Sequence, residues 1–350
     1  MKANRFLTFL TILILATSCK DGSLPRADKS VCDRFSAAGD QLFTDVFAGP
    51  GNVLHSLMII DEGKVVYESW DTGFAPELPH VMWSVSKTFT ATAIGFAEQE
   101  GILSTSDKVI DYFDADELPA EQHPWLTSMT LHDLLIMSSG LPDIVLDAIQ
   151  GKVDNWAKAT LAADFQFEPG TQFQYNSMDS YILSVILSRA TGRKLNDYLE
   201  EKLFAPLKIK EHIWSESPQG YNAGGWGLYL TTESLAKVGQ FFLQRGEWNG
   251  KQLLSEEWFD KATYPHIMQY QNVVTDPVEL EGLRNCRDHW CQGYAYQMWN
   301  CNDGAVRMHG AGCQLCIIFP EQNAVVVTTA EISDEKRILD AIWNNIYPLL

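Results

Sequence analysis

The order of strand-like and helix-like segments constrains the fold of this chain most. Residues 54–70, LHSLMIIDEGKVVYESW, are two apolar runs around Asp-Glu-Gly, the pattern of a β-hairpin. Residues 305–332 contain two further runs rich in β-branched residues, whereas residues 102–225 are mainly helical in pattern with long loops. Strands near both ends, with helices between them, predict one sheet built from both ends of the chain and an inserted helical region.

Two helices are well marked in the sequence. One is predicted from Ser84 to Gln99, with small residues over much of its surface and Gly101 just beyond its end. The final segment, SDEKRILDAIWNNIYPLL, predicts a closing helix with Ser333 as its N-cap. Its predicted buried stripe is Ile338, Leu339, Ile342, Trp343 and Ile346.

The composition is that of a large globular protein. The chain has 350 residues, of which 46% are apolar and 20% charged, enough for a sizeable core in one large domain or two lobes. The formal net charge is −19, and no basic run offsets it. No nucleic acid is therefore expected as a partner, because a polyanion would be repelled.

The first residues have the pattern of an export signal. Lys2 and Arg5 precede an apolar run from Phe6 to Ala16, and small residues then lead into Cys19. The run is shorter than the about 20 residues that a membrane-spanning helix needs. A cysteine in this place resembles the bacterial lipobox, in which the cysteine becomes the lipid-carrying first residue of the mature protein.

We therefore expect residues 1–18 to be a signal peptide and the polar residues 19–30 to be a lipoprotein tether. The expected location is the periplasm, outer membrane or cell surface of a Gram-negative bacterium, with a lipid on Cys19 as the membrane anchor. An ordinary signal peptide followed by an incidental cysteine is the alternative.

Six of the seven cysteines lie beyond the predicted leader: Cys32, Cys286, Cys291, Cys301, Cys313 and Cys316. Because an exported chain meets an oxidising environment, structural disulfides are the first prediction, although the sequence does not choose a pairing. Free thiols and a metal site are the alternatives, since Cys313 and Cys316 have ligand spacing. Side chains three apart on a strand face opposite sides, which argues against a shared metal or a bridge between these two.

The segment VMWSVSKTF, residues 81–89, places Ser84 and Lys87 one helical turn apart. Such a pair is most simply a helix start, with a capping serine and a solvated lysine. In a water-poor pocket, however, desolvation lowers the pKa of a lysine, which can then take the proton of a nearby serine. Amide groups at the start of the helix can stabilise a developing oxyanion. The pair is therefore a candidate nucleophile and base.

Two further segments supply candidate site residues. EPGTQFQYNSMDS places Tyr175 and Ser177 in a loop before a helix, and a phenol beside an ammonium is expected to ionise more easily and shuttle a proton. RMHGAG places His309, Gly310 and Gly312 on or beside a strand, where glycines allow close approach of a substrate or backbone. Considered alone, Tyr175 is more simply interpreted as a half-buried aromatic residue of a loop. The segment around His309 is, considered alone, more simply a tightly packed edge of a sheet.

Ser-x-x-Lys, Tyr-x-Ser and His-Gly-Ala-Gly, in this order, resemble the motifs of the penicillin-recognising serine hydrolases. The resemblance is to the class C β-lactamase-like group, which includes D-alanyl-D-alanine carboxypeptidases, esterases and 6-aminohexanoate-oligomer hydrolases. The segments MTLHDLLIMSSGL, FEPGTQFQYNS and GCQLCIIFPEQNAVVV are also similar to that group. The resemblance extends from about residue 55 to the C-terminus.

This resemblance implies a β-lactamase/transpeptidase-like fold of the α/β (α+β) class in residues 31–350. It consists of an antiparallel sheet flanked by N- and C-terminal helices, plus an inserted all-helical lobe. The α/β lobe would comprise residues 31–95 and 225–350, and the helical lobe residues 96–224. The site would lie in the cleft between the lobes.

The resemblance also implies a role for each candidate residue. Ser84 would be the acylated nucleophile, Lys87 its proton partner and Tyr175 the proton relay to the leaving group. The residues expected to line the substrate site are Ser177, His309, Gly310 and Gly312. The oxyanion hole would be the N–H groups of Ser84 and Gly312, and no metal or organic cofactor is implied.

Two departures from the usual motifs of the group bear on the substrate. Ser177 stands where Asn is common, and His309 stands near the place of a Lys that would hold the carboxylate of a β-lactam or peptide. A neutral His holds a carboxylate less well. The pocket walls are expected from loops 140–170 and 265–300. The candidate lining residues are Trp226, Trp290 and Trp299. Burial in the core is the simpler interpretation of each of these tryptophans.

We therefore expect an exported serine hydrolase that cleaves a small ester or amide through an acyl-enzyme on Ser84. A D-amino-acid peptidase or carboxypeptidase acting on cell-wall peptides is the second expectation, and a true β-lactamase is the third. A catalytically inactive relative that binds a ligand or partner is an alternative of another class.

Overall fold

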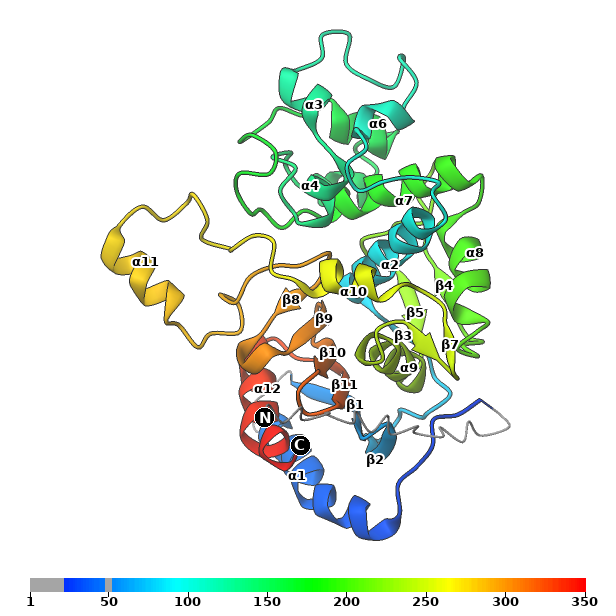
Figure 1. Ribbon diagram of the computed structural model, residues 1–350, viewed down its shortest axis with the longest axis vertical. Coiled ribbons are helices and arrows are strands. Elements are labelled where there is room, and N and C mark those ends of the chain that lie inside the picture. The colour runs from blue at the N-terminus through cyan, green and yellow to red at the C-terminus, as the bar shows by residue number, and fades with distance from the viewer. Residues whose placement is uncertain (1–21, 48–51) are drawn as a thin grey trace, which may run out of the picture.

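The computed structural model describes residues 22–47 and 52–350, which form a sheet-containing body below a helical lobe (Figure 1). The expected signal peptide, residues 1–18, and the expected lipidation site, Cys19, lie outside the described residues. Among the helices of the described part, none is both long and apolar enough to cross a lipid bilayer.

The centre of the molecule is a six-stranded antiparallel sheet in the order β2-β1-β11-β10-β9-β8. Its strands are β1 (Val53–Asp61), β2 (Lys64–Trp70), β8 (Trp299–Asn300), β9 (Val306–Gly310), β10 (Gln314–Phe319) and β11 (Ala324–Glu331). β1 pairs with β11 along nearly its whole length, with a register irregularity between Leu54 and Ser56. This pairing confirms the prediction of a single sheet built from both ends of the chain.

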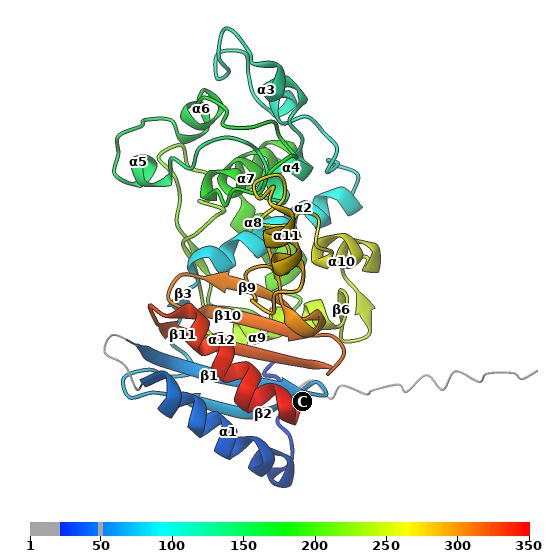
Figure 2. The same cartoon turned by 90° about the vertical axis from the view of Figure 1, so that its left-hand side faces the viewer.

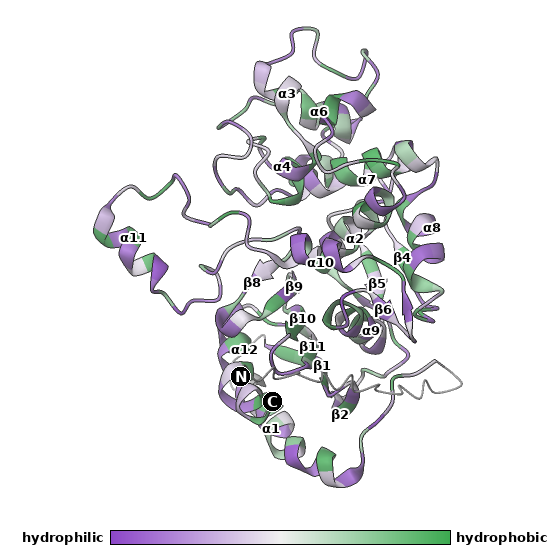
Figure 3. Cartoon of the chain, viewed as in Figure 1, coloured by the Kyte–Doolittle hydropathy of each residue, from purple (hydrophilic) through white to green (hydrophobic). Residues whose placement is uncertain are grey.

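Both faces of the sheet are covered, which explains why its strands are apolar at nearly every position. Helices α1 (Lys29–Phe47) and α12 (Glu335–Ala341) lie on one face, and α9 (Thr232–Leu243) lies on the other (Figure 2). Alternate residues of β10 enter the two apolar clusters: Ile317 packs on the α12 side and Cys316 on the α9 side. The hydropathy colouring of Figure 3 shows the hydrophobic residues of these strands in the interior.

Helix α2 (Ser86–Gln99) leads from the sheet into the helical lobe, where it packs against α7. The helices of this lobe are α3 (Pro124–Ser128), α4 (Leu131–Leu135), α5 (Val145–Ile149), α6 (Trp156–Leu161), α7 (Ser177–Thr191) and α8 (Leu195–Leu199). Helix α7 ends at Gly192, which takes the left-handed conformation (φ 69°) that favours glycine.

The chain returns to the sheet through shorter elements. Strands β3 (His80–Val81), β4 (Ile213–Trp214) and β5 (Leu228–Leu230) form a small second sheet, and β6 (Glu247–Trp248) pairs with β7 (Lys251–Gln252). Two helices follow before β8: α10 (Glu256–Thr263) and α11 (Pro277–Arg284). Helix α11 projects from the body in Figure 1 and has no buried residue.

Two details differ from the sequence-based expectations. Residues 22–28, expected as part of a tether, lie against β2, where the Val65 N–H donates to the carbonyl oxygen of Pro25 at 2.8 Å and Leu24 is buried. The predicted cap of the closing helix is wrong by one residue. Asp334, not Ser333, is the N-cap, because its carboxylate accepts the backbone N–H of Arg337.

Candidate active site

Ser84 lies on a short 3₁₀ turn, Trp83–Val85, that continues directly into α2. Trp83 takes a positive φ of 45° immediately before the serine, a strained conformation for a bulky residue and one often found at functional sites. Ser84 is half-buried, whereas the side chain of Lys87, one turn further on, is 1% exposed. The Ser-Lys pair therefore lies at the start of a helix, as predicted from the sequence.

The ammonium group of Lys87 has three oxygen neighbours. Its Nζ lies 3.1 Å from Ser84 Oγ, 3.3 Å from Ser177 Oγ and 2.7 Å from the carbonyl oxygen of Gly225. A Cβ on Gly225 would lie 2.7 Å from the Ser177 carbonyl oxygen and 3.4 Å from Lys87 Nζ, so glycine is needed for this close approach. Lys87 thus joins the starts of α2 and α7 and the segment before β5.

Burial changes the protonation of Lys87. Desolvation is the largest effect and lowers its pKa to about 7, against the opposing influence of the Asp143 and Asp179 carboxyl groups, which raise it. At neutral pH, Lys87 is therefore a neutral amine in a large fraction of the protein molecules. A neutral amine can accept the proton of the Ser84 hydroxyl.

Tyr175 lies in the loop before α7, with its ring centroid 4.9 Å from Lys87 Nζ. The expectation that this phenol ionises more easily is wrong, because burial raises its pKa well above the usual range. A side-chain hydrogen bond with Ser84 lowers the pKa but does not offset burial. Tyr175 is therefore protonated at neutral pH and is placed to donate a proton, while Lys87 is the group able to accept one.

Ser177 begins α7 and connects the site to an exposed carboxylate that the sequence did not reveal. The Ser177 N–H donates to Asp143 Oδ2 at 2.9 Å, and the other carboxylate oxygen accepts the Val145 N–H at 3.0 Å. The intervening Asn176 is buried and caps α7 through the Met178 N–H at 2.9 Å. The loop 140–170, expected as a pocket wall, therefore contributes Asp143 beside the Ser-Lys pair.

The third predicted motif lies on β9, but its histidine is not free. His309 is 8% exposed; its Nδ1 accepts from Arg307 Nε at 3.1 Å, and its Nε2 lies 3.2 Å from Glu335 Oε2. Burial is the largest effect on His309 and lowers its pKa, so the ring is neutral at pH 7. The ring of Trp290 also packs on it, with centroids 4.9 Å apart. Each ring nitrogen thus faces a neighbouring side chain, Arg307 at Nδ1 and Glu335 at Nε2, although Nε2 makes no hydrogen bond of good geometry.

The two glycines of this motif differ in position. A Cβ on Gly310 would lie 2.2 Å from the Met82 carbonyl oxygen, so glycine lets β9 pack against the segment that leads to Ser84. Gly312 lies in the β9–β10 turn with φ 73°, and its carbonyl oxygen accepts the Ile332 N–H. The structure thus places Gly310, rather than Gly312, against the serine segment. The role of the Gly312 N–H in an oxyanion hole stays a prediction.

Aromatic side chains form a wall beside Tyr175. Trp299 stacks on Tyr175 (centroids 5.7 Å apart, planes at 19°), and Trp290 meets Trp299 edge-on at 4.7 Å. Both indoles also cover the buried guanidinium of Arg307, at 4.4 Å from Trp290 and 5.6 Å from Trp299. Trp226 instead stacks on Trp156 in the helical lobe. Two of the three candidate tryptophans therefore adjoin the site.

No disulfide joins the six cysteines of the described residues. Cys316 lies on the α9 side of the sheet and Cys313 on the α12 side, which confirms that they face opposite ways. Within the described part of the chain, the only cluster of potential metal ligands consists of Cys286, Asp288 and Cys291.

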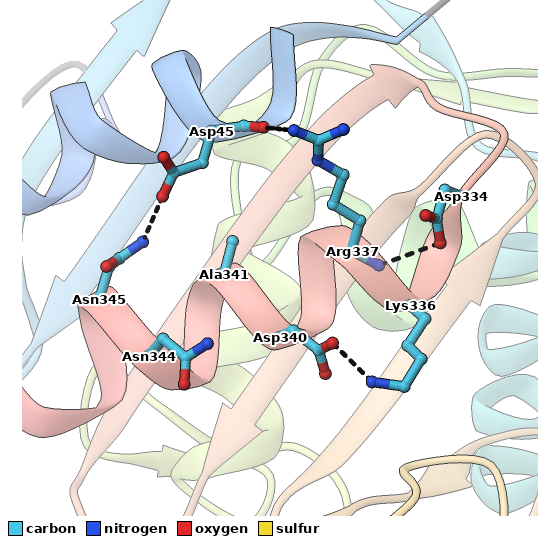
Figure 4. Close-up of a pocket in the computed structure, with 8 residues that line it drawn as sticks. All are labelled: Asp45, Asp334, Lys336, Arg337, Asp340, Ala341, Asn344 and Asn345. Atoms are coloured by element: carbon cyan, nitrogen blue, oxygen red, sulfur yellow. Dashed lines mark hydrogen bonds and ion pairs between the residues drawn. The ribbon is translucent and has the colours of Figure 1, made fainter. Parts of the chain in front are cut away.

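A polar hollow lies between α1 and α12, on the face of the sheet opposite α9 (Figure 4). Its lining residues are Asp45, Asp334, Lys336, Arg337, Asp340, Ala341, Asn344 and Asn345. Several of them satisfy one another: Arg337 donates to the Asp45 carbonyl oxygen, and Asn345 Nδ2 donates to Asp45 Oδ2 at 3.0 Å. It is not formed by Ser84, Lys87 or Tyr175 and has no evident part in their chemistry.

Fold and site together define a two-lobed α/β protein with a Ser-Lys-Tyr cluster where the sheet meets the helical lobe. The chain belongs to the beta-lactamase family, whose model matches residues 47–344. That match includes all three motifs, so the membership expected from the motifs is confirmed.

Individual relatives are distant in sequence. A 6-aminohexanoate-dimer hydrolase of Paenarthrobacter ureafaciens is 24% identical over 222 residues, 59% of this chain and 56% of that protein. A beta-lactamase of Escherichia coli is 26% identical over 238 residues, 63% of this chain and 58% of that protein. The chain thus spans little more than half the length of these curated relatives. A family VIII carboxylesterase has the same fold, with a TM-score of 0.66, 17% identity, and coverage of 92% of this chain and 99% of that one.

Proposed function

We propose that the protein is a serine hydrolase that cleaves an ester or a small amide through an acyl-enzyme on Ser84. The observation that carries this proposal is the buried Lys87, with a pKa of about 7, placed 3.1 Å from the Ser84 hydroxyl. A nucleophile with an adjacent base, a proton donor and helix-start amides are the parts that acyl transfer needs.

The proposed reaction begins when neutral Lys87 takes the Ser84 proton and Ser84 Oγ attacks the substrate carbonyl carbon. The N–H of Ser84, at the start of a helical turn and without an acceptor inside it, would stabilise the oxyanion, together with an amide at the end of β9. Tyr175 donates a proton to the leaving alcohol or amine as the carbon–leaving-group bond breaks, and recovers it from Lys87. Water then attacks the acyl-enzyme and restores Ser84.

The charges around the site favour substrates without a carboxylate next to the scissile bond. Lys87 is engaged with three oxygens, His309 is held by Arg307 and Glu335, and Arg307 lies beneath two indoles. Asp143, in contrast, is an exposed carboxylate beside the Ser-Lys pair. An anionic β-lactam or peptide C-terminus would meet repulsion without a compensating cation, so peptidase and β-lactamase activities are the second and third candidates.

The similar proteins support this proposal, because they include hydrolases of esters and of small amides. The similar proteins include a carboxylesterase and a 6-aminohexanoate-dimer hydrolase. The aromatic wall of Tyr175, Trp299 and Trp290 would suit an apolar or aromatic group in the substrate.

We also propose that the protein is exported and anchored to a membrane by a lipid on Cys19. The support is the basic start, the apolar run and the small residues before this cysteine. Metabolic labelling with a fatty-acid analogue, lost in Cys19→Ser, tests the anchor. Label retained by the variant would contradict it.

The function is tested with the full-length protein and two probes. A fluorophosphonate and, separately, a fluorescent penicillin are incubated with the wild type and with Ser84→Ala, and adducts are measured by intact mass. The expected result is a fluorophosphonate adduct that disappears in the variant and no lasting penicillin adduct. A lasting penicillin adduct would favour cell-wall peptides, and no adduct with folded protein would reject the enzyme and leave a binding protein.

A further inference from the structure

The loop that carries Trp290 is held together by its own short contacts. The Cys291 N–H donates to the Asp288 carbonyl oxygen at 3.0 Å, and the Trp290 N–H donates to Asp288 Oδ1 at 2.9 Å. Gln292 Nε2 donates to the carbonyl oxygens of Cys286 (2.7 Å) and Asp288 (2.9 Å). These bonds turn the chain back on itself and bring the Sγ atoms of Cys286 and Cys291 within 4.8 Å of each other.

This loop follows a segment that makes few contacts with the rest of the molecule. Helix α11, immediately before it, has no buried residue and stands away from the body in Figure 1. At its far end Trp290 packs on Trp299, His309 and Arg307. The loop that positions Trp290 is therefore stabilised little by the segment that precedes it.

We propose that Cys286 and Cys291 form a disulfide that closes this loop and fixes Trp290 over the Arg307–His309 pair. Each thiol gives up its hydrogen, and the S–S bond forms between the two Sγ atoms. The two electrons and two protons reduce a disulfide oxidant, either a protein or a small-molecule disulfide, to two thiols. The expected export of the chain would place it where such oxidants act.

The other described cysteines do not offer an equivalent pair. Cys301 is buried and accepts from Arg307 Nη1, while Cys313 and Cys316 lie on opposite faces of the sheet. Cys32 is on α1, and its thiol lies near the Ala27 carbonyl oxygen. Cys286 and Cys291 are both only half-buried, so an oxidant can reach them.

A metal ion is the competing occupant of the same side chains. Together with Asp288 the two cysteines offer three ligand atoms, one fewer than a closed structural zinc site uses. Asp288 Oδ1 already accepts the Trp290 N–H, and Cys286 Sγ already accepts the Asp288 N–H at 3.2 Å. These contacts favour a bridge over a metal.

The consequence of the bridge concerns the charge available to the substrate. Arg307 is fully buried, and its Nη2 has no hydrogen-bond partner among the described residues. Trp290 covers this guanidinium and His309, the basic groups of β9 that lie beside the aromatic wall. With the loop closed, Trp290 stays over these groups. With the loop released, the free Nη2 becomes able to pair with a carboxylate.

The bridge is tested chemically on the full-length protein purified without reductant. Thiols are alkylated before and after reduction, and peptides are mapped by mass spectrometry. Before reduction, Cys286 and Cys291 are expected in one cross-linked peptide pair, while Cys32 is alkylated. Alkylation of Cys286 and Cys291 without prior reduction would overturn the proposal, as would one bound zinc per chain with both thiols recovered after chelation.

The effect on the site is tested with the Cys286→Ser/Cys291→Ser double variant and with Cys32→Ser as the matched control. The kcat/KM of a p-nitrophenyl ester bearing a free carboxylate, relative to that of p-nitrophenyl acetate, is expected to rise about tenfold in the double variant, the size of one charge-assisted hydrogen bond. An unchanged ratio would refute the role of the bridge in covering Arg307. This second test rests on the proposed function, whereas the peptide map does not. Absence of fluorophosphonate labelling in the wild type would refute the function alone.

Discussion

The protonation of Lys87 is set by its surroundings rather than by its own chemistry. Full burial favours the amine, and the carboxyl groups of Asp143 and Asp179 favour the ammonium, so the resulting pKa of about 7 reflects opposing influences. Because Asp143 is exposed and Asp179 is buried, the two can be separated by mutation. Burial is the largest effect on Asp179 and raises the pKa of its carboxyl group.

We predict that kcat/KM rises with pH through about 7, because only the neutral form of Lys87 accepts the Ser84 proton. Asp143→Asn removes a negative charge that stabilises the ammonium, so the pKa falls. The midpoint should then move to lower pH, by about half a unit for one charge near the surface. The measurement is the pH dependence of ester hydrolysis.

Asp147→Asn is the matched control for this prediction. Asp147 lies on α5 in the same loop region, but it pairs with Lys152 at the surface at 2.8 Å. Its variant should keep the wild-type midpoint. A shift of Asp143→Asn to higher pH, or equal shifts in both variants, would contradict the assignment of Lys87 as the base.

The candidate residues on regular elements could be predicted from the sequence. Ser84 and Lys87 are one helical turn apart, Ser177 begins a clear helix and Tyr175 lies two residues before it, so spacing alone brings each pair together. Asp143 could not be predicted, because its position depends on how the loop after α4 folds back onto the start of α7. The raised pKa of Tyr175 could not be predicted either, since the sequence does not show how deeply a loop residue is buried.

At the scale of elements, α2 shows how close packing constrains a helix that carries a site. All but its last two residues are buried, and it packs between α7 and other parts of the core. A Cβ on Gly95 would lie 2.4 Å from Trp258 Cε2, so α10 approaches α2 at a position where only glycine fits. The small residues noted in the sequence therefore serve contact with a specific neighbour.

We predict that Gly95→Ala destabilises the protein by about 1–3 kcal/mol, because the added methyl group overpacks against Trp258. Gly282, in the interior of exposed α11, is the matched control, since a Cβ added there would meet nothing within 4 Å. Gly282→Ala should be neutral or stabilising by up to about 1 kcal/mol, the helix preference of alanine. Chemical denaturation measures both, and similar effects in the two variants would contradict the packing argument.

Helices whose ends are marked by capping residues and whose buried face forms an apolar stripe can be predicted from the sequence. Helix α7 ends at Gly192, and α9 begins after Thr231, whose side chain accepts the Ser234 N–H; both residue types are common at these helix ends. Helix α11 has a start signal, since Asp276 caps it and Pro277 is its first residue, but it has no buried residue and therefore no apolar stripe to mark its length. The order of the strands in the sheet is likewise open from sequence, since apolar runs do not state their partners.

At the scale of the whole molecule, the N-terminal segment ties distant elements together. Arg26 pairs with Glu68 at 2.8 Å and with Glu233 at 3.1 Å, and the Leu24 N–H also donates to Glu233. The Ala27 N–H donates to the carbonyl oxygen of Val65 at 2.9 Å. Residues 24–27 thus act as an extra edge of the sheet and link β2 to the start of α9.

We predict that a protein beginning at Ser30 is less stable than one beginning at Gly22. It lacks the burial of Leu24, the ion pairs of Arg26 and two backbone hydrogen bonds to Val65. The expected loss is about 2–4 kcal/mol. Thermal and urea denaturation of the two proteins measure it, with Arg26→Ala in the longer one to isolate the ion pairs. Equal midpoints would show that the segment contributes nothing to the fold.

The pairing of β1 with β11 has a consequence for how this protein is made. The middle of the sheet joins a strand near the start of the chain to one near its end. A nascent chain cannot form this contact until synthesis is almost complete, and folds that depend on such long-range contacts assemble slowly. Until then the β1–β2 hairpin exposes an apolar, unpaired edge of the kind that aggregates. The strand order therefore leaves this edge of β1 without its partner for most of the time that the chain is being synthesised.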